Sequence, residues 1–239
     1  MPRFFKTNFE IAPYIEGDDA THIAKSLRMR VGEGLTVCDT NGIDYNCKIS
    51  NVSQGRIDLE ILSSCPTVSE PTVKVTLFQC LPKSDKMDSV VKQSVELGVT
   101  EIVPVISSRC VSLPDAKSSA KKVERWQRIA NEAAGQSGRG ILPKVKEIIT
   151  FKQMLKTLSS FDSALMFYEN GGVSVASANI SDGSCAIIIG SEGGFSPEEA
   201  HAAKENGATI CTLGKRILRT ETAPLAALSA IMILTGNMD

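Results

Sequence analysis

The sequence predicts an α/β protein in two parts, a small all-β domain over residues 1–70 and a larger α/β domain over residues 71–239. Short apolar runs separated by turn residues occupy residues 35–62, whereas strands alternate with helices from residue 73 onward. Between the two patterns, residues 63–71 combine Ser, Pro, Thr and Glu with two prolines. This composition is typical of a boundary, and we place the division there.

Three apolar runs, at residues 35–38, 45–49 and 57–61, are the expected strands of the first part. Thr-Asn-Gly at residues 40–42 and Ser-Gln-Gly at residues 53–55 separate them as turns. The pattern indicates a small β domain.

The second part opens with a strand predicted at residues 73–80, which are rich in β-branched side chains. A helix should follow, with Ser84 and Asp85 as caps and Gly98 as its end. Its apolar face is formed by Met87, Val90, Val91 and Val95. Residues 101–106 predict another strand.

Pro104 within that strand indicates an edge position or a bulge. Apolar side chains then recur at helical spacing over residues 121–136, so we expect an amphipathic helix whose other face is basic. Further buried strands are expected at residues 163–168, 186–189 and 209–213. Alternation of this kind implies a largely parallel sheet, in which ligands bind at the carboxyl ends of the strands.

Composition excludes several classes of protein. The net charge is −1, and no apolar stretch approaches the roughly 20 residues that span a bilayer. Seven scattered cysteines without C-x-x-C spacing argue against a disulfide framework or a zinc site, so we expect reduced core thiols and no metal. No signal peptide is apparent at the amino end, and we expect a cytoplasmic protein.

Residues 187–199 read I-I-I-G-S-E-G-G-F-S-P-E-E, a strand, a glycine-rich turn and a capped helix start. The turn matches neither G-x-G-x-x-G nor a Walker sequence, and Glu192 would repel a phosphate. Backbone groups and a carboxylate can instead accept hydrogen bonds from ribose hydroxyls and from the amino group of an adenine, so a ligand with these groups and no phosphate fits the turn better. S-adenosylmethionine has that character; the alternative is a plain strand-to-helix turn.

Residues 213–223 read L-G-K-R-I-L-R-T-E-T-A, again after a strand. Pro224 begins a helix that ends near Gly236 and is apolar nearly all round, so we expect it to be buried, in the core or in a subunit interface. Arg219 and Glu221 could be catalytic, or could form an ion pair that holds the loop.

Together these two segments resemble the two signature loops of the ribosomal RNA small subunit methyltransferase E family, of the SPOUT superfamily. The similarity extends to L-P-K-S-D-K-M-D from Leu81, E-L-G-V-T-E-I-V-P from Glu96 and R-W-Q-R-I-A-N-E-A-A-G-Q-S-G-R from Arg125. R-F-F at Arg3 and T-H-I-A-K-S-L-R-M-R-V-G-E-G at Thr21 resemble the family's PUA-like RNA-binding domain more loosely.

Two departures from the family are visible. Ser191 replaces the usual proline of the glycine loop, which we expect to loosen the turn, and Thr21 precedes His22 where a second histidine is common. The resemblance implies a PUA-like β-barrel domain at residues 1–70 and a SPOUT domain with a deep trefoil knot at residues 71–239. It also implies a homodimer that uses S-adenosylmethionine to methylate N3 of a specific uridine in 16S ribosomal RNA, within the small ribosomal subunit and without a membrane.

On this basis Arg219 is expected to stabilise the uracil anion or clamp the substrate, and Glu221 to orient Arg219 or assist proton removal. The expected cofactor contacts are Phe167, Gly190, Ser191, Glu192, Gly193, Gly194, Leu213, Gly214, Ile217 and Leu218. The expected RNA contacts are Arg3, His22, Arg28, Lys83, Arg109 and Arg139. Two alternatives stay open, a SPOUT enzyme acting on a ribose 2′-hydroxyl and an RNA-binding ribosome assembly factor without catalysis.

Overall fold

The computed structural model describes residues 1–111, 113–181 and 183–238. The chain divides into two compact units. The first comprises residues 1–70 and 134–142, and the second comprises residues 71–133 and the described residues after 142. Residues 134–142 therefore group with the amino-terminal residues, although they lie beyond the predicted boundary.

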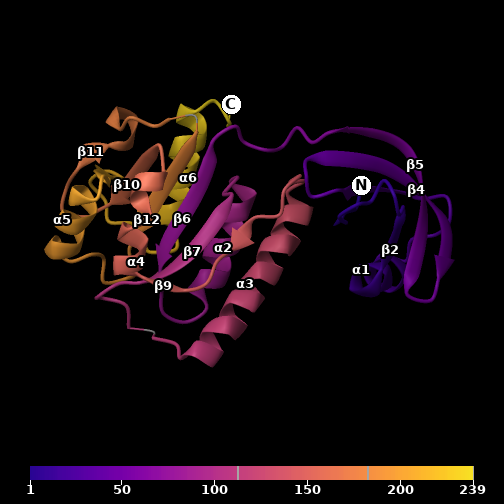
Figure 1. The fold of residues 1–239 in the computed structure, drawn as a ribbon, viewed down its shortest axis with the longest axis horizontal. Coiled ribbons are helices and arrows are strands. Elements are labelled where there is room, and N and C mark those ends of the chain that lie inside the picture. The colour runs from indigo at the N-terminus through magenta and orange to yellow at the C-terminus, as the bar shows by residue number, and fades with distance from the viewer. Residues whose placement is uncertain (112, 182, 239) are drawn as a thin grey trace. The chain divides into compact units, whose positions relative to one another are not determined.

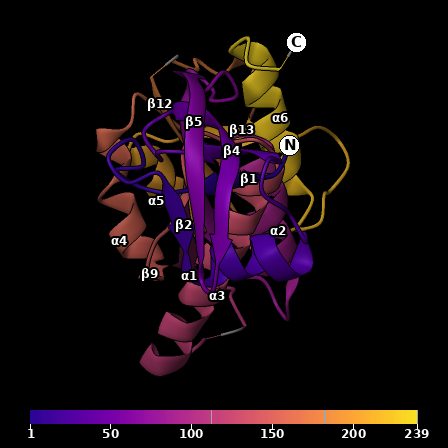
Figure 2. The same cartoon turned by 90° about the vertical axis from the view of Figure 1, so that its right-hand side faces the viewer.

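The first unit is built on one five-stranded sheet in the order β1-β3-β4-β5-β2. The strands are β1 (Arg3–Phe5), β2 (Tyr14–Glu16), β3 (Gly34–Cys38), β4 (Ile43–Ser53) and β5 (Arg56–Pro66). β1 pairs with β3 in parallel and the other pairs are antiparallel; Figure 2 shows β4 and β5 side by side. All three predicted runs fall within strands, and β4 and β5 extend beyond them through polar residues.

A short helix, α1 (Gly17–Thr21), and a π-helical turn, His22–Ser26, complete the unit. Its core contains the fully buried side chains of Phe9, Ile23, Leu35, Ile49 and Ile57. These come from the sheet, from the helical segment and, for Phe9, from the turn between β1 and β2, so apolar burial holds the three together.

One buried ion pair joins the two stretches of sequence in this unit. The Arg139 guanidinium, 3% exposed, donates to both carboxylate oxygens of Glu70 at 2.9 and 2.7 Å. Gly140 N–H donates to the same carboxylate at 2.7 Å. Burial alone would raise the pKa of Glu70, but these hydrogen bonds hold it below its ordinary value.

The second unit contains an eight-stranded sheet in which every described strand pair is parallel, as the sequence predicted. Seven strands follow the order β11-β13-β10-β12-β6-β7-β8, and β9 pairs with β7. They are β6 (Lys74–Cys80), β7 (Glu101–Ile106), β8 (Lys144–Val145), β9 (Ile149–Thr150), β10 (Ser163–Phe167), β11 (Val173–Ser174), β12 (Ser184–Ile189) and β13 (Thr209–Thr212). Figure 1 shows helices packed around these strands.

The helices of this unit follow from local sequence, with some differences at their ends. They are α2 (Lys86–Glu96), α3 (Ala116–Gln136), α4 (Phe151–Leu155), α5 (Pro197–Glu205) and α6 (Ala223–Leu234), with 3₁₀ turns at Leu158–Ser160 and Val175–Ser177. The predicted apolar face of α2 is buried, and Gly98 has a φ of 92° just after its end. The predicted side-chain cap is wrong, because Asp85 occupies the N-cap position without a capping hydrogen bond.

Pro104 occupies neither a free edge nor a bulge. β7 lies between β6 on one side and the short β8 and β9 on the other. β8 pairs with residues 101 and 102, and β9 pairs with residues 105 and 106. Pro104 therefore falls in the gap between two short partners, where a missing N–H costs no ladder hydrogen bond on that side.

Three other expectations need adjustment. α3 begins at Ala116, five residues before the predicted start. Cys65 is exposed, whereas the other six free cysteines are buried. α6 is buried along one side only, since Ile233 and Leu234 are 59% and 48% exposed. Among the described residues, no helix is both long and apolar enough to cross a membrane.

Candidate active site

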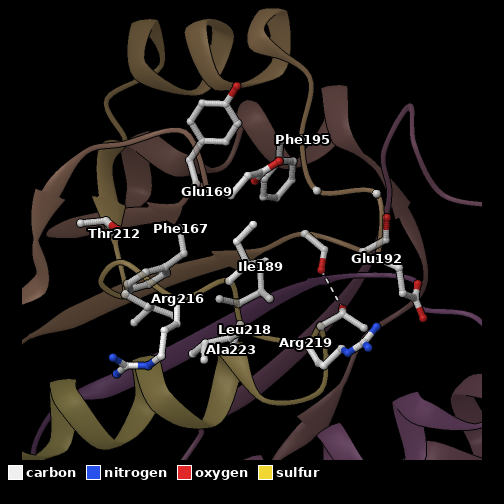
Figure 3. A pocket seen from close by; sticks show the side chains of 18 of the residues that line it. Phe167, Glu169, Ile189, Glu192, Phe195, Thr212, Arg216, Leu218, Arg219 and Ala223 are labelled. Carbon is white, nitrogen blue, oxygen red and sulfur yellow. Dashed lines mark hydrogen bonds between the residues drawn. The ribbon is translucent and has the colours of Figure 1, made fainter.

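A pocket of about 480 Å³ opens in the second unit where β10, β12 and β13 end. Two loops form most of its wall, the glycine loop of residues 190–196 through residues 190–195 and the second loop of residues 213–222 through residues 213–220; Glu221 is not among the lining residues. In Figure 3, Phe167, Ile189 and Leu218 gather at the centre of the pocket, and Glu192 and Arg219 lie at one side. The predicted meeting of the two loops at the carboxyl edge of the sheet is confirmed.

The glycine loop is a tight turn that requires glycine at residues 190 and 194. Gly194 N–H donates to the Ser191 carbonyl oxygen at 2.9 Å, and Gly194 has a φ of 64°. A Cβ atom at Gly190 would lie 3.1 Å from the Gly194 Cα atom. This hydrogen bond closes the turn with Ser191 in place of proline, and the Ser191 side chain is buried, while the expected loosening relative to proline stays a prediction.

The exit from the glycine loop is fixed by a capping box at the start of α5. Glu199 N–H donates to Ser196 Oγ at 3.2 Å, and Ser196 N–H donates to Glu199 Oε2 at 3.0 Å. Pro197 follows at the first helical position. The sequence predicted all three features, since capping depends on local spacing alone.

A buried hydrogen-bond cluster ties the two loops together below the pocket. Thr220 Oγ1 donates to the Gly190 carbonyl oxygen at 2.7 Å. Gln79, at the end of β6, donates from Nε2 to Thr220 Oγ1 at 3.1 Å and to the Gly190 carbonyl at 3.3 Å. Gln79 is fully buried and Thr220 is 5% exposed, so little water competes with these bonds.

Replacing Thr220 with valine, which has nearly the same shape, should weaken the pocket. The Gly190 carbonyl would keep only its longer bond from Gln79, and a buried polar group left unpaired costs about 1–3 kcal/mol. We expect a lower free energy of unfolding in urea and a reduced affinity for S-adenosylmethionine in calorimetry. Thr222→Val, at an exposed position two residues along, is the control; an equal effect of both variants would contradict the assignment.

One lysine joins the acidic side chains of the two loops. Lys86 Nζ, from the first residue of α2, lies 3.0 Å from Glu192 Oε1 and 3.2 Å from Glu221 Oε2. Hydrogen bonds to the two carboxylates raise the pKa of Lys86. Burial alone would raise the pKa of Glu192, but its backbone and Lys86 hydrogen bonds hold it below its ordinary value.

The alternative of an Arg219–Glu221 ion pair is not what the structure contains. Among the described ion pairs, Glu221 pairs with Lys86, and none joins it to Arg219. Arg219 is exposed at the pocket wall, and its carbonyl oxygen accepts from the Thr222 and Ala223 N–H groups at 2.9 Å. The start of α6 thus fixes the Arg219 backbone and leaves its guanidinium available to a ligand.

All ten residues predicted as cofactor contacts line the pocket. Arg219, predicted as catalytic, also lines it, and so do Lys215 and Arg216, which lie within the predicted cofactor segment. The lining residues that the sequence did not indicate are Tyr168, Glu169, Ile189, Phe195, Thr212, Thr220 and Ala223. Glu169 is notable because a Cβ atom at Gly194 would collide with its carboxylate. Its place just after the predicted strand at residues 163–168 was the available signal, because loops at that edge form ligand sites.

The predicted RNA contacts in the second unit lie beside the glycine loop. Lys83 has an exposed side chain, and its backbone N–H donates to both Glu192 carboxylate oxygens at 3.2 Å. Arg109 Nη1 donates to the Gly193 carbonyl oxygen at 2.8 Å. Arg109 therefore supports the loop itself, a role that its position in the sequence did not reveal.

In the first unit, His22 and Arg28 are exposed, but two predicted contacts are not free to meet a phosphate. Arg139 is buried against Glu70, and Arg3 pairs with Asp44 at 2.5 Å with 11% of its side chain exposed. Either guanidinium would have to break a buried ion pair to reach RNA. In this structure Arg3 and Arg139 hold the fold, and their RNA contact stays a prediction that the buried ion pairs disfavour.

The pocket suits a nucleoside with a charged tail and no phosphate. Phe167 and Ile189 are buried apolar walls, and glycine backbone groups supply close hydrogen-bond partners. Carboxylates of Glu169 and Glu192 can meet hydroxyl or ammonium groups, whereas Lys215 and Arg216 can meet a carboxylate. S-adenosylmethionine carries all of these groups, so the lining fits it.

Comparison with known proteins identifies the class of protein to which this fold and pocket belong. An RNA methyltransferase domain model matches residues 69–232, and an RNA methyltransferase PUA domain model matches residues 15–62. The fold and the pocket are therefore those of an RNA methyltransferase.

Individual relatives narrow the class. The ribosomal RNA small subunit methyltransferase E of Bacillus subtilis (strain 168) is 36% identical, over 98% of this chain and 97% of the relative. The crystal structure of the Neisseria gonorrhoeae protein of the same name, bound to S-adenosylmethionine, superposes with a TM-score of 0.90 at 36% identity, over 98% of each chain. This chain belongs to the ribosomal RNA small subunit methyltransferase E family.

Proposed function

We propose that this chain transfers a methyl group from S-adenosylmethionine to N3 of a specific uridine in the RNA of the small ribosomal subunit. The observation that carries the proposal is the pocket itself. Its glycine loop and second loop are joined by Thr220, and Arg219 stands exposed at its wall. The relatives named above support the cofactor and the class of RNA.

The residues present match the demands of the reaction. S-adenosylmethionine, when bound, supplies an electrophilic methyl group on a positively charged sulfur. N3 of uracil carries a proton at neutral pH, so that proton must leave and the resulting negative charge spreads over O2 and O4. Arg219 has several N–H donors that can bind such an anion, and it needs no proton transfer to do so.

Glu221 is the second group that we propose at the reacting base. Its carboxylate lies against Lys86 and close in sequence to Arg219. A carboxylate can accept the N3 proton directly or through a water molecule. The residues that would hold the cofactor are the ten glycine-loop, second-loop and strand-end positions predicted from the sequence, joined by Glu169.

RNA would be held by exposed cations outside the pocket. Lys83 and Arg109 beside the glycine loop, and His22 and Arg28 in the first unit, are the predicted contacts that the structure leaves exposed. With a net charge of −1, affinity would come from local basic groups and would fall as salt rises. The target uridine would leave its stack to reach the pocket.

Mass spectrometry of 16S RNA tests the proposal directly. Small subunits from cells lacking the protein are incubated with the purified protein and S-adenosylmethionine, and nucleosides are then analysed. We expect one 3-methyluridine to appear. A 2′-O-methylated nucleoside would instead indicate attack on the ribose, and absence of any product despite cofactor binding in calorimetry would indicate a non-catalytic RNA-binding protein.

We also propose that the protein acts as a homodimer through α6. That helix is apolar along almost its whole length, yet Ile233 and Leu234 remain largely exposed. Exposed apolar side chains at the end of a hydrophobic helix favour an interface. Sedimentation equilibrium should give twice the 25.6 kDa chain mass, and a monomer at micromolar concentration would refute the dimer.

The family resemblance further leads us to propose that the carboxyl-terminal segments form a deep trefoil knot. Threading of this kind is rare, so it deserves an independent test. Pulling the protein from both termini in a single-molecule experiment should give an extended chain shorter than a fully straightened one of 239 residues. A full contour length would exclude the knot.

A further inference from the structure

We propose that Lys86 is a positioning residue for methyl transfer, which holds the acidic side chains of the glycine loop and the second loop together by pairing with both. The proposal rests on the proposed function, and it gives a specific role to a lysine that the sequence analysis met only as part of the L-P-K-S-D-K-M-D motif. Its basis is the contact of one ammonium group with Glu192 of the glycine loop and Glu221 of the second loop.

The two carboxylates are neighbours with a single cation between them. Each lies within 3.2 Å of the same nitrogen atom, so without Lys86 two negative groups would face each other. Like charges at this range repel strongly where solvent is partly excluded. One loop would then have to move, or one carboxylate would have to take up a proton.

Lys86 occupies a helix position at which a lysine is electrostatically unfavourable. It is the first residue of α2, at the positive end of the helix dipole, where acidic residues are favoured. The carboxylates of Glu192 and Glu221 offset that repulsion. A cation at this end is therefore better explained by what it binds than by the helix that carries it.

The backbone next to Lys86 is also fixed on the glycine loop. Lys83 N–H donates to both oxygens of the Glu192 carboxylate at 3.2 Å. Ser84 then adopts a φ of 56°, a conformation uncommon outside glycine. Because of this bend, the backbone N–H of residue 83 and the side chain of residue 86 both contact the Glu192 carboxylate, from two directions.

The position of Lys86 affects the groups at the reacting base through Glu221. Glu192 and Arg219 lie on the same side of the pocket (Figure 3), and Glu221 is two residues after Arg219. By holding Glu221 to Glu192, Lys86 fixes the position of the second loop relative to the glycine loop. Small displacements of groups around a reacting atom are costly, up to about 100-fold in rate for roughly 1 Å.

Four variants test the proposal in the same assay as wild type, with methyl transfer to small subunits measured as kcat and KM. Lys86→Met should lower kcat by roughly 10- to 100-fold while KM for the subunit changes little. Lys86→Arg, which keeps the charge, should retain most of the activity. Lys86→Met with Glu192→Gln should recover part of the loss, because the repulsion is gone. Lys92→Met, at an exposed position on the same helix, is the matched control.

The outcomes separate the two proposals. An inactive wild type overturns the proposed function and this inference with it. An active wild type with a fully active Lys86→Met variant overturns the inference alone. The inference is also overturned if Lys86→Met loses activity and thermal stability together and neither the arginine nor the Glu192→Gln change restores any activity, because Lys86 would then serve only the fold.

Discussion

Replacing Arg219 with alanine is expected to lower kcat for methyl transfer by roughly 10²- to 10³-fold, equivalent to about 2.7–4 kcal/mol of transition-state stabilisation. Arg219 lines the pocket with an exposed guanidinium, and the uracil anion that forms as N3 loses its proton needs donors at O2 or O4. Affinity for S-adenosylmethionine should change much less, because the glycine loop and its hydrogen bonds stay in place.

Arg219→Lys serves as the graded comparison. Lysine keeps the positive charge but cannot offer two parallel N–H groups, so this variant should fall between alanine and wild type. Single-turnover rates with saturating cofactor, together with circular dichroism, check both variants. A folded Arg219→Ala protein with wild-type turnover would remove Arg219 from the reaction.

Replacing Arg139 with alanine is expected to cost the first unit about 3–5 kcal/mol in the free energy of unfolding. The change would leave the Glu70 carboxylate buried without its main partner, although two backbone N–H groups would still donate to it. Urea denaturation followed by a probe in the first unit measures the loss. We expect any loss of RNA affinity in this variant to follow from unfolding.

Two companions to Arg139→Ala separate the charge from the packing. Arg139→Met combined with Glu70→Leu removes both charges and keeps much of the volume, so it should be far more stable than the single variant. Asp58→Asn breaks the exposed Arg56–Asp58 pair while Arg56 stays over the Tyr14 ring, and it should have little effect, since surface pairs contribute little. Equal destabilisation by the buried and exposed changes would show that burial of Arg139 is unimportant.

Local patterns in the sequence were sufficient for most of the fold. The parallel sheet followed from strands alternating with helices, and the start of α5 followed from Ser196, Pro197 and Glu199. The glycine loop followed from three glycines after an apolar run. In each case the residues that decide the structure lie within a few positions of one another, so their spacing is visible in the chain.

The predictions from sequence were wrong where the local structure depends on a neighbour that is distant in the sequence. Pro104 is accommodated by two short strands some 40 residues later, and the Asp85 side chain caps no helix although its position suits a cap. Neither fact has a local signal, because periodicity does not show which side of an element receives a partner.

The sequence by itself determined the longer strands and helices, the two loops and the chemical character of their ligand, since capping, turns and periodicity are short-range. Only the tertiary structure decided which charges meet. It paired Glu221 with Lys86, and it buried Arg139 against Glu70. Ion pairs and buried hydrogen bonds depend on distance in space, and residues more than a hundred positions apart, such as Gln79 and Thr220, meet only after the sheet has formed.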